Sequence, residues 1–232
     1  MKVKLFADGA AKEVMLEMYK NPLISGLTTN PSLMRKAGVK DYKEFSKDIL
    51  SSITDKPISL EVFTDDLDEM LQQAIEISSW GKNVYVKIPI TNTKGESTYD
   101  VIKSLAKKNV KVNVTAILTI EQVYHILPAI SKCPAGYISI FAGRIADTGK
   151  NPVPMMKLAL EVLKGFPNLE IIWASSRELY NVIQANKVGC HIITITKDIF
   201  NKIPMIGKDL NELSLDTVKT FYNDAVGSGY SI

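Results

Sequence analysis

The 232-residue sequence predicts an α/β protein in which residues 1–232 form a single (β/α)8 barrel domain with an additional helix near the C-terminus. Short apolar segments alternate eight times with segments of helical periodicity. Several apolar segments are continuous hydrophobic runs, which are typical of strands buried on both faces of a parallel sheet. No Gly-rich phosphate-binding motif follows a strand, so the pattern favours a barrel over a nucleotide-binding doubly wound sheet.

In the first half of the chain, each predicted strand is a short apolar run, and each predicted helix carries apolar residues three or four positions apart. The first helix ends before Asn21-Pro22, because proline disfavours helical geometry in the preceding residue. Asp65 and Asp66 mark the start of the third helix, where acidic side chains cap free N–H groups and meet the positive end of the helix dipole. The predicted strands are 3–7, 24–27, 58–63 and 84–88, and the predicted helices are 10–19, 41–53, 65–80 and 97–108.

The second half of the chain keeps the same alternation. Residues 143–152 are predicted to form a loop, and Pro154 stands in the first turn of the next helix, where the missing N–H costs least. The predicted strands are 111–116, 137–141, 169–174 and 191–195. The predicted helical segments are 119–130, 154–164, 178–186, 197–200 and 215–225, followed by a tail at 227–232.

Composition excludes several classes of protein. The net charge of +3 is small, and no dense basic cluster indicates a nucleic-acid partner. No apolar run reaches the roughly 20 residues that cross a bilayer, and the charged N-terminus does not resemble a signal peptide. Cys133, Cys190, His125 and His191 lack the spacing of a disulfide framework or a metal site. We therefore expect a cytoplasmic protein that needs no metal and no other cofactor.

Polar side chains stand at nearly every predicted strand end. In a (β/α)8 barrel the C-terminal ends of the strands carry the chemistry. This varied set of side chains therefore predicts an active site at that end of the barrel. The residues, all polar except Phe141, are Asp8, Thr28, Asn30, Glu61, Lys87, Asn113, Thr115, Ser139, Phe141, Arg144, Ser175, Arg177 and Thr196.

Lys87 is the most informative of these residues, because it interrupts an apolar strand. Strand alternation puts Lys87 on the same face as Tyr85, opposite Val84 and Val86. If that face points into the barrel, the amine lies in a water-poor pocket from which it can attack a carbonyl carbon. The alternative is a lysine at an exposed strand end whose charge reaches solvent.

The acids and arginines at the strand ends each have two interpretations. Asp8 and Glu61 could transfer protons beside a Schiff-base lysine, although Asp8 could instead cap the following helix. Arg144 and Arg177 suit an anionic group such as phosphate, assisted by Ser175 before a helix. Their alternative is surface ion pairing with acids such as Asp147 or Glu178.

Five motifs resemble the transaldolase family, in particular its short members, which include small transaldolases and fructose-6-phosphate aldolases. The resemblance extends over essentially the full length, with the motifs in order at matching spacing. They are Thr28-Thr29-Asn30-Pro31-Ser32-Leu33, Val86-Lys87-Ile88-Pro89-Ile90-Thr91, Asn113-Val114-Thr115, Phe141-Ala142-Gly143-Arg144-Ile145 and Ala174-Ser175-Ser176-Arg177.

This resemblance implies a class I aldolase barrel in which Lys87 forms a Schiff base with the C2 carbonyl of a ketose. Asp8 would take the C4 hydroxyl proton, and Glu61 and Thr115 would hold the water that shuttles protons during imine formation. Other residues would bind substrate: Thr28, Asn30 and Asn113 with Ser139 and Phe141 around the dihydroxyacetone unit, and Arg144, Ser175 and Arg177 at the distal phosphate.

Within the family, Glu61, Phe141 and Asn113 match the transaldolases, whereas fructose-6-phosphate aldolases carry Gln and Tyr at the first two positions. We therefore predict a transaldolase of the pentose phosphate pathway that acts on sugar phosphates. Aldol cleavage of fructose 6-phosphate, or transfer from another anionic ketose such as a sulfonated one, is the alternative. Short members also assemble through the C-terminal helix, so a homo-oligomer, such as a ring, is expected. A non-catalytic binding barrel and a phosphosugar isomerase are the competing classes.

Overall fold

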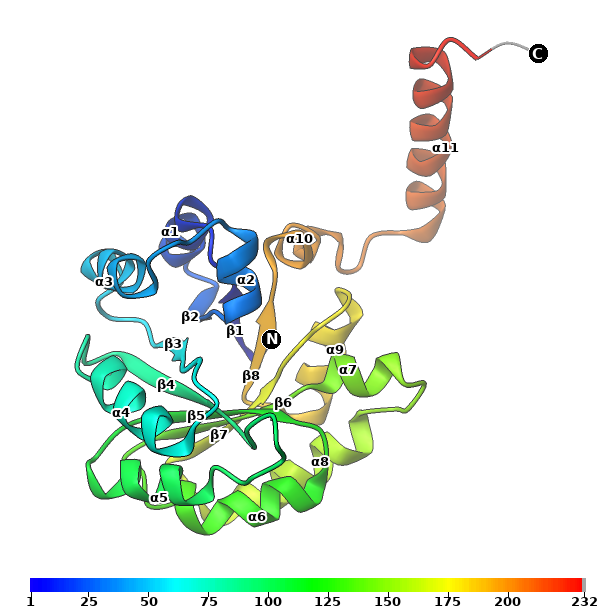
Figure 1. The fold of residues 1–232 in the computed structure, drawn as a ribbon. Coiled ribbons are helices and arrows are strands. Elements are labelled where there is room, and N and C mark those ends of the chain that lie inside the picture. The colour runs from blue at the N-terminus through cyan, green and yellow to red at the C-terminus, as the bar shows by residue number, and fades with distance from the viewer. Residues whose placement is uncertain (231–232) are drawn as a thin grey trace. The chain divides into compact units, whose positions relative to one another are not determined.

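The computed structural model describes residues 1–230, and the chain divides into two compact units, Met1–Phe200 and Asn201–Ile232. The first unit is a closed barrel of parallel strands that follow one another around the barrel in chain order (Figure 1). This topology confirms the predicted (β/α)8 barrel. The strands are β1 Lys4–Asp8, β2 Ile24–Thr28, β3 Ile58–Glu61, β4 Val84–Pro89, β5 Val112–Ile117, β6 Gly136–Ile140, β7 Leu169–Trp173 and β8 Ile192–Ile195.

Helices connect consecutive strands and surround the barrel (Figure 1). Asp66 begins α4 as expected, since its carboxylate accepts the N–H groups of Asp68 and Glu69. The helices of this unit are α1 Lys12–Lys20, α2 Pro31–Lys36, α3 Tyr42–Ser52, α4 Leu67–Ser78, α5 Tyr99–Lys107, α6 Ile120–Ile130, α7 Ala142–Asp147, α8 Val153–Val162, α9 Tyr180–Val188 and α10 Lys197–Phe200, with a 3-10 turn η1 at Leu163–Gly165.

Two of these helices, α2 and α7, differ from the sequence prediction. The loop predicted at 143–152 is wrong over its first half, because Ala142–Asp147 is helical. Helix α2 was not predicted; the Asn30 side chain caps it by accepting the N–H of Leu33 at 3.0 Å, and Pro31 occupies its first turn. Both helices have six residues, which is too short for a hydrophobic periodicity to appear in the sequence.

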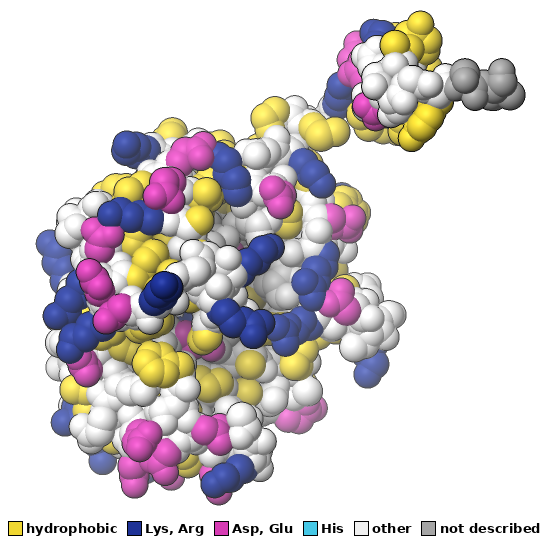
Figure 2. Space-filling model, turned by 45° about the horizontal axis from the view of Figure 1, so that its top comes forward, with side chains coloured by type: hydrophobic (Ala, Val, Ile, Leu, Met, Phe, Trp, Pro, Cys, Tyr) yellow, Lys and Arg dark blue, Asp and Glu magenta, His cyan; other side chains and the backbone are white. Residues whose placement is uncertain are grey.

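The second unit contains a 3-10 turn η2 at Ile203–Met205 and the helix α11 at Leu210–Gly227. Helix α11 begins before the predicted 215–225 because Asp209 caps it, accepting the N–H groups of Asn211 and Glu212. Of the predicted tail, residues 231–232 lie outside the described residues. No side chain of α11 is buried, and hydrophobic side chains are visible on its surface (Figure 2). Among residues 1–230, no helix has both the length and the apolar character required to cross a bilayer.

Aromatic side chains fill the barrel interior on the side of the N-terminal ends of the strands. The rings of Tyr85 and Tyr137 stack with centroids 4.1 Å apart, and Phe6 meets Tyr137 edge-on at 5.7 Å. A Cβ atom at Gly26 would lie 2.5 Å from the Phe6 ring, so only glycine leaves room for this ring. Because Tyr85 points inward, Lys87 two residues later points inward as well, one layer closer to the C-terminal ends of the strands.

His191 makes the stability of the barrel depend on pH. Its Nδ1 accepts the backbone N–H of Ile171 at 3.0 Å, and burial lowers its pKa below the ordinary value of about 6.5, with Lys4 adding to the effect and Glu170 opposing it. The unfolded chain therefore binds this proton more readily, and stability is lost as the pH falls from about 6.5 toward the folded pKa. We expect the melting temperature to decline between pH 7.5 and 5.5. His191→Asn keeps an acceptor that cannot be protonated, so the decline should be smaller; an equal decline in both proteins would contradict this assignment.

Candidate active site

The C-terminal ends of the strands surround a cavity of about 500 Å³, called here the mouth cavity. A larger groove of about 870 Å³ lies among α2, α3 and α4, but its walls are mostly apolar. The mouth cavity contains the buried Lys87 together with the carboxylates Asp8 and Glu61, and is therefore the candidate site. Ten of the residues predicted from the sequence line it: Asp8, Thr28, Asn30, Glu61, Lys87, Thr115, Ser139, Phe141, Arg144 and Ser175.

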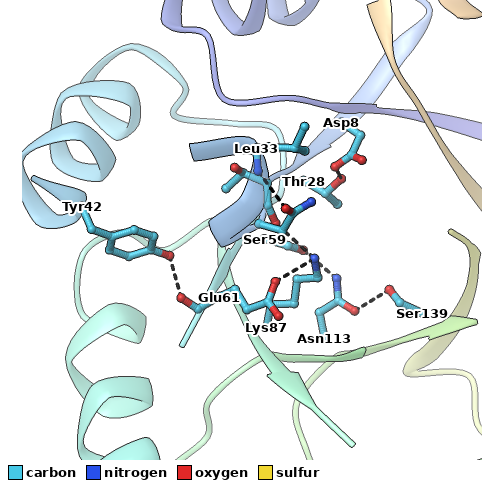
Figure 3. A network of polar contacts seen from close by, with 11 residues as sticks. Asp8, Thr28, Leu33, Tyr42, Ser59, Glu61, Lys87, Asn113 and Ser139 are labelled. Carbon is cyan, nitrogen blue, oxygen red and sulfur yellow. Dashed lines mark hydrogen bonds and ion pairs between the residues drawn. The ribbon is translucent and has the colours of Figure 1, made fainter. Parts of the chain in front are cut away.

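Lys87 lies at the centre of the polar network in this cavity (Figure 3). Its residue is only 6% exposed, so the alternative of a solvent-facing lysine is wrong. The β3–β4 register pairs Lys87 with Glu61, and their Nζ and Oε2 atoms are 3.0 Å apart. Nζ also donates to the backbone carbonyl of Thr29 at 3.1 Å. The amine is thus held in one position beside a carboxylate that can accept its proton.

Glu61 is itself held from outside the barrel by Tyr42 on α3. The Tyr42 hydroxyl donates to the Glu61 backbone carbonyl at 2.8 Å (Figure 3). Burial and the nearby Glu61 charge raise the pKa of Tyr42 well above its usual value, so the phenol stays a donor. Sequence reasoning missed Tyr42, because nothing in a helical tyrosine indicates a hydrogen bond to a strand end.

Asp8 stands at the end of β1, beside Thr28 at the end of β2. Thr28 Oγ1 donates to Asp8 Oδ1 at 2.9 Å (Figure 3). The alternative role as a helix cap is wrong, because α1 starts at Lys12 and its N-cap residue is Ala11. Burial raises the pKa of the Asp8 carboxyl above its ordinary value, while the Lys87 charge and the Thr28 hydrogen bond act in the opposite direction. A carboxylate with a raised pKa is a stronger base.

Asn113 lies just beneath the mouth cavity, and its amide is fixed on both sides. Its Nδ2 donates to Ser59 Oγ at 2.9 Å, and its Oδ1 accepts the Ser139 hydroxyl at 2.7 Å (Figure 3). All three side chains are buried. The Ser59 hydrogen bond uses one of the two Nδ2 hydrogens of this amide. Ser59 was not predicted from the sequence, although strand alternation puts it on the same face as Glu61.

Thr115 brings an unpaired hydroxyl to the wall of the mouth cavity. Its Oγ1 is buried and has no hydrogen-bond partner among residues 1–230. The β5–β6 register shifts between Val114 and Ile117, and Ala116 adopts a left-handed conformation with φ 61°. Strained backbone and an unsatisfied hydroxyl are costly in a fold, and both are typical of sites where a ligand supplies the missing partner.

Another wall of the mouth cavity is formed where α7 meets the end of β7. A Cβ atom at Gly143 would lie 1.6 Å from the Ser175 carbonyl oxygen, so this contact requires glycine. Ser175 itself has a left-handed φ of 63°. The Arg144 guanidinium lies 5.0 Å above the Phe141 ring, a cation–π arrangement that keeps a positive charge at this wall.

Arg177 is held differently from Arg144. Its backbone N–H donates to Asn181 Oδ1 at 2.7 Å, and its guanidinium forms an ion pair with Asp147 at the end of α7. Its side chain passes close to Gly143. Among residues 1–230, those that line the mouth cavity do not include Arg177. The ion-pair alternative considered from the sequence thus exists for Arg177. At the end of β8, Thr194 rather than Thr196 faces the mouth cavity.

Metal-binding side chains do not cluster near this site. Within residues 1–230, no three His, Cys, Asp or Glu side chains are close enough together to hold a metal ion. His125 instead shares a hydrogen bond of 2.7 Å with Ser97, and neither residue lines the mouth cavity.

The fold and the site define a class of enzyme: a (β/α)8 barrel with a buried lysine between two carboxylates at the C-terminal ends of its strands. The sequence model of the family described as Transaldolase/Fructose-6-phosphate aldolase matches residues 5–232. The chain belongs to this family.

Relatives over most of the chain agree with that assignment. A protein of Caldicellulosiruptor saccharolyticus named "Probable transaldolase" is 39% identical over 195 residues, covering 83% of this chain and 85% of the relative. One of Thermoanaerobacter sp. with the same name is 34% identical over 224 residues, covering 96% and 98%. Among solved structures, orotidine 5'-monophosphate decarboxylase from Metallosphaera sedula superposes with a TM-score of 0.55 at 12% identity, covering 87% and 91% of the two chains; this likeness concerns the fold alone.

Proposed function

We propose that the protein is a transaldolase that transfers a dihydroxyacetone unit from a ketose phosphate, fructose 6-phosphate or sedoheptulose 7-phosphate, to an aldose phosphate. The observation that carries the proposal is the buried Lys87, with its Nζ atom 3.0 Å from Glu61 and subject to the charge of Asp8. Membership in the family and relatives named as transaldolases support it.

The first half of the reaction forms the Schiff base. Lys87 loses a proton to Glu61, and its lone pair attacks the C2 carbonyl of the ketose. The carbinolamine then loses water, and Glu61 returns the proton that this departure requires. The unpaired Thr115 hydroxyl supports a role in binding the water that is released. Asn113 donates to a hydroxyl of the dihydroxyacetone unit, and Asn30 and Thr28 line the mouth cavity that receives this unit.

The second half breaks and makes the carbon–carbon bond. Asp8 removes the C4 hydroxyl proton, the C3–C4 bond breaks, and its electrons flow into the imine to form an enamine on Lys87. An aldose leaves, and the enamine carbon attacks the aldehyde of a second aldose. Asp8 then returns its proton to the new C4 oxygen. Hydrolysis of the imine then releases the new ketose.

The distal anionic group of the sugar is proposed to bind at the wall of Arg144 and Ser175, with Arg177 beside it. Two guanidinium groups near a half-buried serine favour phosphate, and they also suit the sulfonate of a sulfonated ketose. A transaldolase of sugar phosphates belongs to the pentose phosphate pathway, and the cytoplasm is the compartment proposed for it.

Phe141 separates transfer from simple aldol cleavage. An enamine that gains a proton instead of an aldehyde yields free dihydroxyacetone, and Phe141 lines the mouth cavity without a proton to give. We expect Phe141→Tyr to raise dihydroxyacetone release from fructose 6-phosphate about tenfold relative to transfer, because an acid near the carbon assists protonation. The assay compares this release with sedoheptulose 7-phosphate formed from erythrose 4-phosphate. If the unmodified enzyme releases dihydroxyacetone as fast as it transfers it, fructose-6-phosphate aldolase is the correct function.

We also propose that the enzyme is a homo-oligomer, such as a ring, that assembles through α11. Apolar side chains of this helix are largely exposed: Leu210, Leu215, Val218, Phe221, Tyr222 and Val226. A helix with this much unburied apolar surface is typical of an interaction site. Light scattering of the full chain should give several times the mass of one subunit, and Phe221→Asp should reduce that mass. A monomeric unmodified protein would contradict the assembly.

A further inference from the structure

The ion pair between Arg177 and Asp147 has no role in the reaction described above. Asp147 ends α7, and the guanidinium that reaches it starts from the loop after β7. Both side chains are about half exposed, at 48% for Arg177 and 52% for Asp147. An exposed pair of this kind adds little stability. Its position beside the anion-binding wall gives it a different significance.

The path of the Arg177 side chain shows what the pair does to the charge. A Cβ atom at Gly143 would lie 3.2 Å from Arg177 Nε, so the side chain runs along the same turn of α7 that carries Arg144. Nη2 then continues to the carboxylate of Asp147. The Nε end of the Arg177 guanidinium therefore lies beside the wall of the mouth cavity, whereas Nη2 is directed toward Asp147.

We propose that Asp147 is a specificity-determining residue that competes with the anionic group of the substrate for Arg177. This inference rests on the proposed function, because it assigns the distal anion to the wall of Arg144 and Ser175. When an anion binds, the guanidinium exchanges the Asp147 carboxylate for the oxygens of the ligand. Asp147 thus lowers the affinity for every anion.

The competition also affects how strongly the site prefers a dianionic ligand over a monoanionic one. The three side chains carry a net charge of +1: Arg144 and Arg177 are positive, and Asp147 is negative. Without Asp147 the local charge would be +2. Because Coulomb energy is proportional to ligand charge, a dianion gains twice as much free energy from this change as a monoanion. The pair therefore reduces the preference for a phosphate monoester, a dianion near pH 8, over a sulfonate, a monoanion.

Titration calorimetry at low ionic strength and pH 8 tests the proposal without requiring turnover. The probes are inorganic phosphate, mostly a dianion at this pH, and methanesulfonate, a monoanion. Asp147→Asn should tighten methanesulfonate binding about threefold and phosphate binding about tenfold, the square of the first factor, as expected for one exposed charge. Both gains should shrink at high salt. In an Arg177→Ala background, Asp147→Asn should have no effect.

Glu161→Gln is the matched control, because it removes one carboxylate from another exposed ion pair of the barrel, with Lys164. It should leave anion binding unchanged. Equal tightening by Glu161→Gln, no change in Asp147→Asn, or weaker binding in that variant would overturn the proposal; weaker binding would mean that Asp147 aims Arg177 at the ligand. Borohydride trapping of dihydroxyacetone, which has no anionic group, reports separately on Lys87, so failure of the proposed function is distinguishable from failure of this inference.

Discussion

Replacing Lys87 with methionine should abolish turnover, with a loss of about 10⁴-fold or more, as expected when a covalent nucleophile is removed. In the proposed mechanism, the buried amine, 3.0 Å from Glu61, attacks the ketose. In the unmodified enzyme, borohydride with fructose 6-phosphate or dihydroxyacetone should reduce the imine and leave a three-carbon adduct on Lys87 alone. Peptide mass spectrometry identifies the modified residue.

Lys111→Met provides the matched control for this experiment. Lys111 precedes β5 at the opposite end of the barrel, where its Nζ donates to the Lys82 carbonyl. This variant should keep both turnover and the adduct. Thermal unfolding of Lys87→Met shows whether the barrel survives the loss of a buried cation beside Glu61. An adduct on another lysine, or turnover without any adduct, would exclude Lys87 as the nucleophile and with it the Schiff-base mechanism.

Strand alternation links the depth of Lys87 to that of Tyr85, but the sequence pattern alone left open which face of the strand points into the barrel. Once Tyr85 fills the barrel interior, Lys87 must share its face. The register between β3 and β4 then brings Glu61 beside Lys87. Residues at the C-terminal strand ends converge because parallel strands end on the same side of the barrel, so ten of the predicted site residues line one cavity.

What the sequence could not predict depends on partners that leave no local pattern. Thr29 holds Lys87 through a backbone carbonyl, a group that every residue possesses. Ser59 and Asn113 are 54 positions apart in the chain, so their hydrogen bond follows only from the closed barrel. The left-handed conformations of Ala116 and Ser175 oppose the ordinary preference of non-glycine residues. Tertiary contacts impose them, and both residues border the mouth cavity.

Arg177 illustrates how two interpretations of one residue can be compatible. The sequence left open an anion-binding arginine and an arginine in an ion pair, and the structure contains the ion pair with Asp147. That pair does not exclude anion binding, because an exposed pair contributes little free energy and is easily exchanged. Arg177 can therefore take both roles, with the Asp147 carboxylate and the anionic ligand competing for its guanidinium.

The second large effect is expected at Asp8, where Asp8→Asn should lower the rate of carbon–carbon bond cleavage by about 10²- to 10⁴-fold, the usual contribution of a general base. Asparagine keeps the shape and can still accept the Thr28 hydrogen bond, but it cannot take the C4 hydroxyl proton. Asp48→Asn, at an exposed ion pair with Lys12, is the matched control and should retain full activity.

The pH profile gives an independent measure of the same step. Burial raises the pKa of Asp8, so cleavage in the unmodified enzyme should be lost as the pH falls through a value above the ordinary 3.9 or so, because the protonated carboxyl no longer accepts a proton. This acid limb should be absent from Asp8→Asn. Borohydride should still trap dihydroxyacetone on Lys87 in that variant, because forming the imine requires Glu61 and not Asp8. Loss of both trapping and cleavage would instead assign Asp8 to the support of Lys87, whose charge acts directly on the Asp8 carboxyl.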